Sequence, residues 1–304
     1  MSEERFKVVL SGASGMLGRA LREALHARQF PTLQLVRGTP ASSGRLAWNP
    51  AVEPAMGNAA ALEGVAAAVH LSGASLAGHR WTAAYKRELA SSRVQSTHAL
   101  ARLLSSLKRP PQTLLAASAV GFYGDRGEEL LDESSPAGAG FLAKLCTEWE
   151  AAAKPAVEAG IRVVHLRFGI VLGGGEGALA AMLPVFRLGL GGRLGTGRQW
   201  MSWISLADAI AAILFAMETP GLVGAVNLTA PNPVRNVDFT LALGRQLKRP
   251  AILPVPAIAL RLALGQIADE ALLASARAFP HQLTSAGFQF THPMVNEALA
   301  AVLI

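Results

Sequence analysis

The chain has 304 residues, of which 51% are hydrophobic and 16% are charged, a balance typical of a compact globular protein and not of a disordered one. Its net charge of +7 comes from 28 basic and 21 acidic residues dispersed along the sequence, which suits a small anionic ligand and does not indicate nucleic acid. No apolar stretch is long enough to span a bilayer, and we expect that the first seven residues are not a leader peptide. The single cysteine, Cys146, excludes an internal disulfide. We therefore expect a cytoplasmic protein with a small-molecule substrate and no membrane or nucleic-acid partner, compatible with a homodimer.

The beginning of the chain has the order strand, glycine-rich turn, helix, in the segment FKVVLSGASGMLGRALREAL at residues 6–25. The apolar run Val8–Leu10 is suited to a buried strand, and leucines then recur every fourth residue, the spacing of one helix face. Such a helix offers free N–H groups and a partial positive charge at its start. The order therefore predicts a diphosphate site at the turn.

Each of the three glycines in this turn has an expected role. Gly12 allows the sharp turn out of the strand, Gly15 lets a pyrophosphate approach the backbone, and Gly18 lets the helix pack close to the sheet. The segment is a dinucleotide-binding pattern because it follows a strand and precedes a helix. The cofactor is expected to contact these residues of the turn: Gly12, Ser14, Gly15, Met16, Leu17 and Gly18.

The second predicted strand, Thr32–Val36, ends at Arg37. A dinucleotide site has an acid here to bind the ribose 2′-hydroxyl of NAD, or an arginine to accept the 2′-phosphate of NADP. No acid is nearby, so the sequence favours NADP, although an arginine in a surface turn is the simpler alternative.

Apolar strands and helical patterns alternate over the first three quarters of the chain, which predicts an α/β fold with a doubly wound parallel sheet of the Rossmann type. Thr82 is a suitable N-cap for a helix that runs to about Leu104. Because ligands bind beyond the carboxyl ends of parallel strands, residues just after the strands are candidates for contacts. Further strands are predicted at Val65–Leu71, Thr113–Ala117, Ile161–Leu166 and Val223–Leu228, and further helices at Phe141–Ala153 and from Asp208 to about Met217. Candidate cofactor contacts are Leu71, Ser72, Gly73 and Phe168, and Ser75 is a candidate substrate contact.

The pattern changes after Gly173, where glycine-rich links and then helices punctuated by prolines dominate. We expect a cofactor-binding domain over residues 1–230, with a lid insertion at about 174–203, and a smaller, mostly helical C-terminal substrate lid over 231–304. Trp200 and Trp203 are candidates to line the substrate pocket, and packing within the lid is the alternative.

Short motifs are spread over nearly the whole chain: GASGMLG (12–18), LSGAS (71–75), RWT (80–82), SR (92–93), SAVGFYG (118–124), FLAKLCTEWE (141–150), LRFGIVLG (166–173), QWMSWI (199–204) and GFQF (287–290). Together they resemble the extended, atypical short-chain dehydrogenase/reductase superfamily. The finer pattern is similar to its NAD-dependent epimerase/dehydratase-like subgroup with a C-terminal domain of unknown function. The resemblance implies a Rossmann fold that binds NADP, with oxidoreductase or epimerase-like activity on a small hydroxyl- or carbonyl-bearing substrate.

One part of the family pattern is missing. The resemblance implies a YxxxK pair, in which a lysine lowers the pKa of a tyrosine whose free value of about 10 is too high for a base at neutral pH. Here the matching positions are Phe141 and Leu145, and Lys144 lies one place early, without a phenol as partner.

Three interpretations of this gap stay open. In the first, Ser118 and Tyr123 form a relocated donor pair at the nicotinamide, instead of a strand-end cap and a packing tyrosine. In the second, the protein binds NADP but catalyses little, as a sensor or scaffold. In the third, Lys144 or Cys146 transfers the proton, although a free cysteine is usually a core thiol. The candidate catalytic residues are therefore Ser118, Tyr123 and Lys144. The absence of paired histidine or cysteine spacing gives no sign of a metal site.

Overall fold

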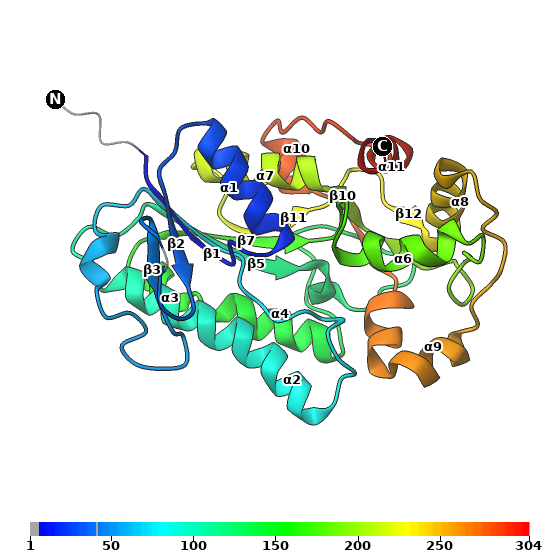
Figure 1. The fold of residues 1–304 in the computed structure, drawn as a ribbon, viewed down its shortest axis with the longest axis horizontal. Coiled ribbons are helices and arrows are strands. Elements are labelled where there is room, and N and C mark those ends of the chain that lie inside the picture. The colour runs from blue at the N-terminus through cyan, green and yellow to red at the C-terminus, as the bar shows by residue number, and fades with distance from the viewer. Residues whose placement is uncertain (1–5, 41, 304) are drawn as a thin grey trace.

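The computed structural model describes residues 6–40 and 42–303, so five of the seven residues on which the leader-peptide expectation rests lie outside the described residues. A seven-stranded sheet forms the centre, and helices cover both of its faces (Figure 1). Every strand pair in the sheet is parallel. Its strands, in spatial order, are β11 (Gly224–Leu228), β7 (Arg162–Phe168), β5 (Thr113–Ala119), β4 (Ala67–His70), β1 (Val8–Ser11), β2 (Thr32–Val36) and β3 (Arg45–Ala47). This order confirms the predicted doubly wound α/β fold.

The direction of winding reverses next to β1. The chain adds β2 and β3 on one side of β1 and then continues with β4 on the other. In open α/β sheets this reversal leaves a crevice at the carboxyl ends of the two strands, and ligands bind there. The topology therefore places the glycine turn after β1 beside the segment that follows β4.

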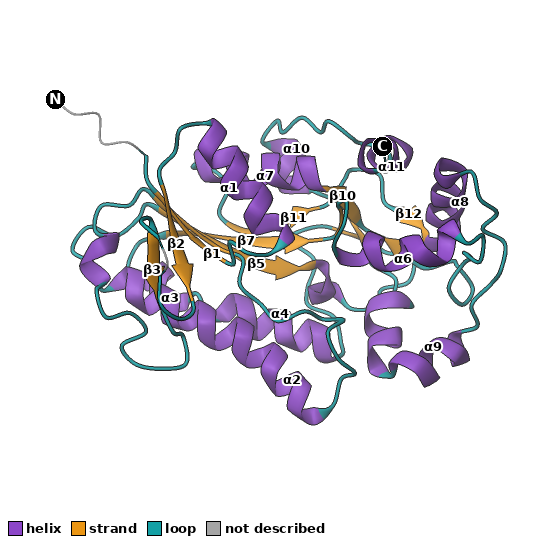
Figure 2. Cartoon of the chain, viewed as in Figure 1, coloured by secondary structure: helices purple, strands orange, loops and turns teal. Residues whose placement is uncertain are grey.

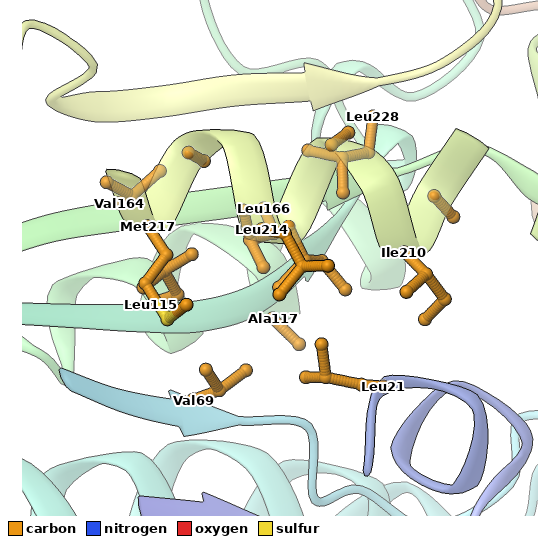
Figure 3. Close-up of a cluster of buried hydrophobic side chains, with 14 of the residues drawn as sticks. Leu21, Val69, Leu115, Ala117, Val164, Leu166, Ile210, Leu214, Met217 and Leu228 are labelled. Carbon is orange, nitrogen blue, oxygen red and sulfur yellow. The ribbon is translucent and has the colours of Figure 1, made fainter. Parts of the chain in front are cut away.

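Two sets of helices cover the two faces. On one face lie α1 (Met16–Ala27), α7 (Leu206–Glu218) and α10 (His281–Ser285), and on the other lie α2 (Ala83–Ala90), α3 (Ser96–Ser105), α4 (Phe141–Ala151) and α5 (Lys154–Glu158) (Figure 1). Leu21 of α1 and Leu214 of α7 pack with Val69 and Leu115 of the sheet, as Figure 3 shows. Leucines of α3 pack against Val9 on the opposite face. Both faces of β1 are therefore buried, which is why its sequence is a continuous apolar run.

The long helix expected after Thr82 is present in three joined parts. Its start is confirmed, because the Thr82 side chain accepts a hydrogen bond from the Tyr85 N–H at 3.2 Å. A π-helical turn, Ser91–Gln95, separates α2 from α3. This turn has no signal in the sequence, because single-residue insertions into a helix leave no period of their own. The strand β3 was not predicted either, since it has only three residues and two of them are exposed.

The rest of the chain surrounds the carboxyl ends of β5, β7 and β11 and is mostly helical (Figure 2). Its helices are α6 (Gly177–Arg187), α8 (Asn236–Leu247), α9 (Ala257–Leu264), the π-helical turn η4 (Ala268–Leu272) and α11 (Val295–Val302). Short strands join them: β6 (Leu130–Leu131), β8 (Ile170–Leu172), β9 (Trp200–Met201), β10 (Trp203–Ser205), β12 (Val234–Arg235) and β13 (Arg277–Ala278). Short 3-10 turns, η1 (Ala59–Leu62) and η3 (Val120–Tyr123), complete the chain. Within residues 6–40 and 42–303, no helix is both long and apolar enough to cross a membrane.

Candidate functional site

The turn after β1 requires glycine at two positions for reasons internal to the protein. Gly12 has φ of +77°, and a Cβ there would lie 2.6 Å from the carbonyl carbon of Leu71. A Cβ at Gly18 would lie 2.1 Å from the carbonyl oxygen of Gly12. Both contacts are with backbone, which cannot move aside, so these glycines fix the turn against α1 and against the segment after β4.

Gly15 differs from these two glycines, because the protein leaves room for a side chain at its position. A Cβ there would meet one atom within 4 Å, the Gly12 carbonyl oxygen at an ordinary 3.6 Å. Gly15 is also the N-cap of α1, and no side chain caps the helix there. Bare main chain and free N–H groups at the start of a 12-residue helix fit a diphosphate group.

Arg37 follows the last residue of β2 and is exposed. It forms no hydrogen bond or ion pair with any residue among 6–40 and 42–303. A guanidinium without a partner at this edge of the sheet is free to bind a phosphate in a bidentate manner.

The other predicted cofactor contacts are divided between the surface and the core. The segment after β4 lies against the glycine turn, since the Cβ position of Gly12 is 2.8 Å from the Ser72 backbone nitrogen. Gly73 and Ser75 are exposed there. Phe168, by contrast, ends β7 as a core residue with 9% of its surface exposed. Ser14 is exposed on the turn, and Met16 and Leu17 are half-buried.

Ser118 and Tyr123 belong to one hydrogen-bond network, but they do not contact each other directly. The Ser118 hydroxyl donates to Oε1 of Glu150 at 2.7 Å. Arg167 binds both carboxylate oxygens of Glu150, at 2.8 and 2.9 Å, and donates from Nη1 to the Tyr123 hydroxyl at 3.0 Å. The Tyr123 hydroxyl donates to Oδ1 of Asn227 at 2.8 Å. No local sequence pattern predicts the contacts of Glu150, Arg167 and Asn227, because their partners are far away along the chain.

The position of Tyr123 suits a structural role. Its side chain has no exposed surface, and its hydroxyl is already bound by Asn227 and Arg167. Burial raises its pKa above the usual value for a phenol, so the side chain stays neutral at physiological pH. Ser118 is 2% exposed. The structure therefore gives neither residue of the predicted donor pair access to a ligand.

The face of α4 nearest the end of β5 carries Leu142 and Cys146 instead of Phe141 and Leu145. A Cβ at Gly121 would lie 3.3 Å from Cβ of Leu142 and 3.9 Å from Sγ of Cys146. Burial raises the pKa of the Cys146 thiol to about 12, which makes it a poor base and nucleophile. Phe141 instead packs edge-on against Trp81.

Lys144 lies away from this face. Its side chain is 77% exposed, and its ammonium group lies 3.8 Å from a carboxylate oxygen of Glu148, one turn along the helix. The structure does not bring it together with Ser118 or Tyr123, which lie at the buried end of β5. No pair of positions on α4 holds a tyrosine beside a lysine, because the chain has only two tyrosines and neither lies on this helix.

The two tryptophans occupy different environments. Trp203 has no exposed surface and donates from Nε1 to the Asn232 carbonyl, so it packs within the protein and is out of reach of a ligand. Trp200 is half-buried, and two guanidinium groups lie over its ring, that of Arg235 at 4.7 Å and that of Arg277 at 4.3 Å from the ring centre. Its Nε1 donates to Glu128 at 2.9 Å.

Comparison with known families identifies the chain. Residues 8–228, from the first residue of β1 to the last of β11, match the model of the NAD-dependent epimerase/dehydratase family. The chain belongs to this family. Residues 255–302 match a second model, a domain of unknown function named DUF1731. The resemblance inferred from the sequence motifs is thereby confirmed.

Relatives of similar length come from bacteria, plants and animals. The epimerase family protein Mb2239 of Mycobacterium bovis is 47% identical over 292 residues, 96% of either chain. The human epimerase family protein SDR39U1 is 32% identical over 300 residues, 98% of this chain and 99% of that protein. A crystal structure of human SDR39U1, isoform 2, with NADPH superposes with a TM-score of 0.89 at 31% identity and covers 97% of this chain and 98% of that one. A UDP-N-acetylglucosamine 4-epimerase from Bacillus cereus shares the fold, with a TM-score of 0.76 at 14% identity.

Proposed function

We propose that this protein binds NADP(H) at the turn between β1 and α1, and uses it in an oxidoreductase or epimerase-like reaction on a small hydroxyl- or carbonyl-bearing substrate. The observation that carries the proposal is the bare main chain at Gly15, which leads into an uncapped helix start. The family membership and the NADPH in the human relative's crystal structure support it. The chemistry supplied by the cofactor would be hydride transfer, and the chain binds and orients the two reactants.

The preference for NADP over NAD rests on Arg37. Its guanidinium, which pairs with no residue among 6–40 and 42–303, suits the 2′-phosphate of NADP, and the sequence has no acid at this strand end to bind the ribose hydroxyl of NAD. Replacing Arg37 with serine should weaken NADPH binding by about tenfold or more and leave NADH binding within about twofold, because only NADPH carries the additional phosphate. Equal losses for both cofactors would show that Arg37 does not read the phosphate.

A second candidate function is favoured by the chemistry of α4. No tyrosine or lysine lies on the helix face near Ser118, and the candidate groups that do lie there are a thiol of raised pKa and a carboxylate bound by Arg167. In this alternative the protein is an NADPH-binding sensor or scaffold with little turnover. Binding would then regulate a partner instead of reducing a substrate.

A single assay separates the two candidates. The protein is incubated with NADPH and a panel of carbonyl compounds and nucleotide sugars, and the absorbance of NADPH is followed. Net consumption of NADPH with one class of compound supports the oxidoreductase function and identifies its substrate class, whereas an epimerase regenerates its cofactor and is detected instead by conversion of a sugar into its epimer in the presence of NADP⁺. Tight NADPH binding with neither NADPH consumption nor epimer formation across the panel supports the sensor.

A further inference from the structure

The end of the molecule formed by α6, α8 and the chain after α8 exposes several large apolar side chains. These segments lie at the end opposite β3 (Figure 1). Leu188, just after α6, is 74% exposed, and Ile252, which follows α8, is 77% exposed. We call this surface the end face and define it by these residues: Leu188, Leu190, Leu241, Ile252 and Leu253, which are all exposed, with the basic residues Arg187, Arg245, Lys248 and Arg249.

Contacts between two loops make the end face continuous. A Cβ at Gly189 would lie 3.4 Å from Cγ of Pro250, and the Leu253 N–H donates to the Gly191 carbonyl at 3.3 Å. The loop after α6 and the loop after α8 therefore run side by side. The exposed leucines of the first loop thus lie beside the exposed apolar residues of the second.

An open hollow of about 340 Å³ lies on the end face, between α8 and the loop that follows it. Leu241 and Ile252 line it, together with Arg245, Lys248 and Arg249. Leu241, Arg245 and Lys248 recur at helical spacing, so one side of α8 presents an apolar residue followed by two cations. The hollow therefore combines an apolar lining with positive charge.

Every charged side chain in these segments is positive. The chain has no aspartate or glutamate between residues 177 and 207, or between residues 239 and 268. None of the basic residues of the end face forms an ion pair with a carboxylate of residues 6–40 and 42–303. Unpaired charge of one sign attracts partners of the opposite sign.

The mixture of apolar and cationic side chains favours one kind of occupant. Exposed apolar patches rimmed by polar residues mark interaction sites. A second copy of the chain fits poorly, because two copies of the end face would bring positive charge against positive charge. A membrane also fits poorly, since the end face has no tryptophan or tyrosine, the side chains enriched at membrane surfaces, and its hollow is concave. Phosphates of a nucleic acid would pair with the cations but leave the apolar side chains uncovered.

We propose that the end face docks a segment of a partner protein that carries several aspartates or glutamates beside a large apolar side chain. The apolar side chain fills the hollow between Leu241 and Ile252, and the carboxylates pair with Arg245, Lys248 and Arg249. Charge selects an acidic partner and speeds its encounter, and burial of apolar surface provides affinity. The inference is independent of the proposed function, because no residue of the end face belongs to the cofactor site.

The test begins with the full-length protein and a phage-displayed library of random short peptides. We expect the selected peptides to be enriched in aspartate and glutamate together with leucine, isoleucine or phenylalanine. One enriched peptide is then synthesised with a fluorescent label, and its dissociation constant is measured by anisotropy at several salt concentrations. The affinity should fall as the salt concentration rises, because exposed charges are screened.

A double variant tests the charge of the end face. Arg245→Glu combined with Arg249→Glu should bind the peptide at least about tenfold more weakly than the wild type. The control combines Arg45→Glu on β3 with Arg87→Glu on α2, which makes the same change of net charge at exposed positions outside the end face. It should stay within about twofold of the wild type. Both variants should bind NADPH as the wild type does, and their melting temperatures should stay within about 3 °C of it.

A second pair of variants tests the apolar lining of the hollow. Ile252→Ser should weaken peptide binding by about threefold or more, because less apolar surface is buried in the complex. Val223→Ser changes an equally apolar, exposed residue outside the end face and should leave peptide binding unchanged. Should the double charge variant not fold, Lys248→Glu tests the same charge, and unchanged peptide affinity in it would overturn the inference.

Several other results would also overturn the inference. The first is a library that yields no acidic apolar peptides, or an enriched peptide that binds the wild type and the Arg245, Arg249 variant equally well. The second is binding of phosphatidylserine vesicles or of a DNA duplex, in place of peptides, that the same variant loses; the end face would then belong to a membrane or a nucleic acid. The third is a dimer in sedimentation experiments that this variant disrupts, which would assign the end face to a second copy of the chain.

Discussion

The two ends of the candidate site differ in the kind of atoms that build them. The turn between β1 and α1 is made of main chain, and its requirements are small residues at fixed spacing. The region between β5 and α4 depends on particular side chains. Leu142 and Cys146 of α4 face the end of β5, and Phe141 and Leu145 occupy the positions where the sequence resemblance implies a tyrosine and a lysine. The difference predicts that substitutions at the main-chain end affect binding of the cofactor, and that substitutions at the side-chain end leave it nearly unchanged.

The largest effect is expected at the main-chain end. Gly18→Ala places a Cβ 2.1 Å from the Gly12 carbonyl oxygen, so either the turn or α1 must move. We expect the free energy of unfolding to fall by about 3 kcal/mol or more, and NADPH binding to be lost. Urea denaturation measures the first and titration the second. Gly221→Ala, which meets no atom within 4 Å, is the matched control and should be neutral. A stable, NADPH-binding G18A would contradict the tight turn.

At the side-chain end, the ion pair between Glu150 and Arg167 should matter next. Their side chains are 13% and 5% exposed, and breaking such a pair leaves a buried charge without a partner. Glu150→Gln should lower the free energy of unfolding by about 3 kcal/mol. Glu158→Gln breaks an exposed pair with Lys154 and should cost less than about 1 kcal/mol. Equal losses in the two variants would mean that the buried network contributes no special stability.

His70 lies between the two ends and makes stability depend on pH. It bridges Ser11 at the end of β1 and Ser96 on α3, and burial lowers its pKa from 6.5 to about 4. Below pH 6.5 the unfolded chain takes up a proton that the folded protein does not accept until about pH 4. Stability should therefore fall as the pH drops through this window, by about 2 to 3 kcal/mol from this group. In His70→Gln the free energy of unfolding should lose this part of its pH dependence. If chemical denaturation gives the same pH profile for the variant and the wild type, His70 is not its source.

The smallest effect is expected for Tyr123→Phe. The change removes a hydroxyl that is bound by Asn227 and Arg167, so the free energy of unfolding should fall by about 1 to 2 kcal/mol. NADPH affinity should stay within about twofold, because the residue has no exposed surface. If a substrate is found, turnover measured in the same variant decides its role: lost turnover at nearly unchanged stability would restore Tyr123 to the mechanism.

The sequence was sufficient for those parts of the fold that depend on local pattern. Apolar runs such as Val8–Leu10 predicted buried strands, and Thr82 predicted the start of a helix, because these signals reside in neighbouring residues. The three-residue β3 and the π-helical turn at Ser91–Gln95 were missed, because neither has a period long enough to detect.

The part of the candidate site that is built from main chain could be predicted from the sequence. Glycine spacing located the turn, and a strand end located Arg37. The buried network could not be predicted, because Glu150 and Arg167 meet only when α4 packs on the sheet. The same limit explains Trp203: its sequence neighbourhood resembles that of Trp200, but the fold buries one and leaves the other partly open.

The most direct test of the account is the NADPH affinity of Gly15→Ala, measured together with its melting temperature. Gly15 has φ of −76°, which alanine adopts without strain, and its Cβ would meet only an ordinary protein contact. We predict a melting temperature within about 3 °C of the wild type and NADPH binding weaker by about tenfold or more, because the new methyl group occupies the place of the diphosphate. A G15A variant that binds NADPH as tightly as the wild type would contradict the central claim that bare main chain at this turn holds the cofactor.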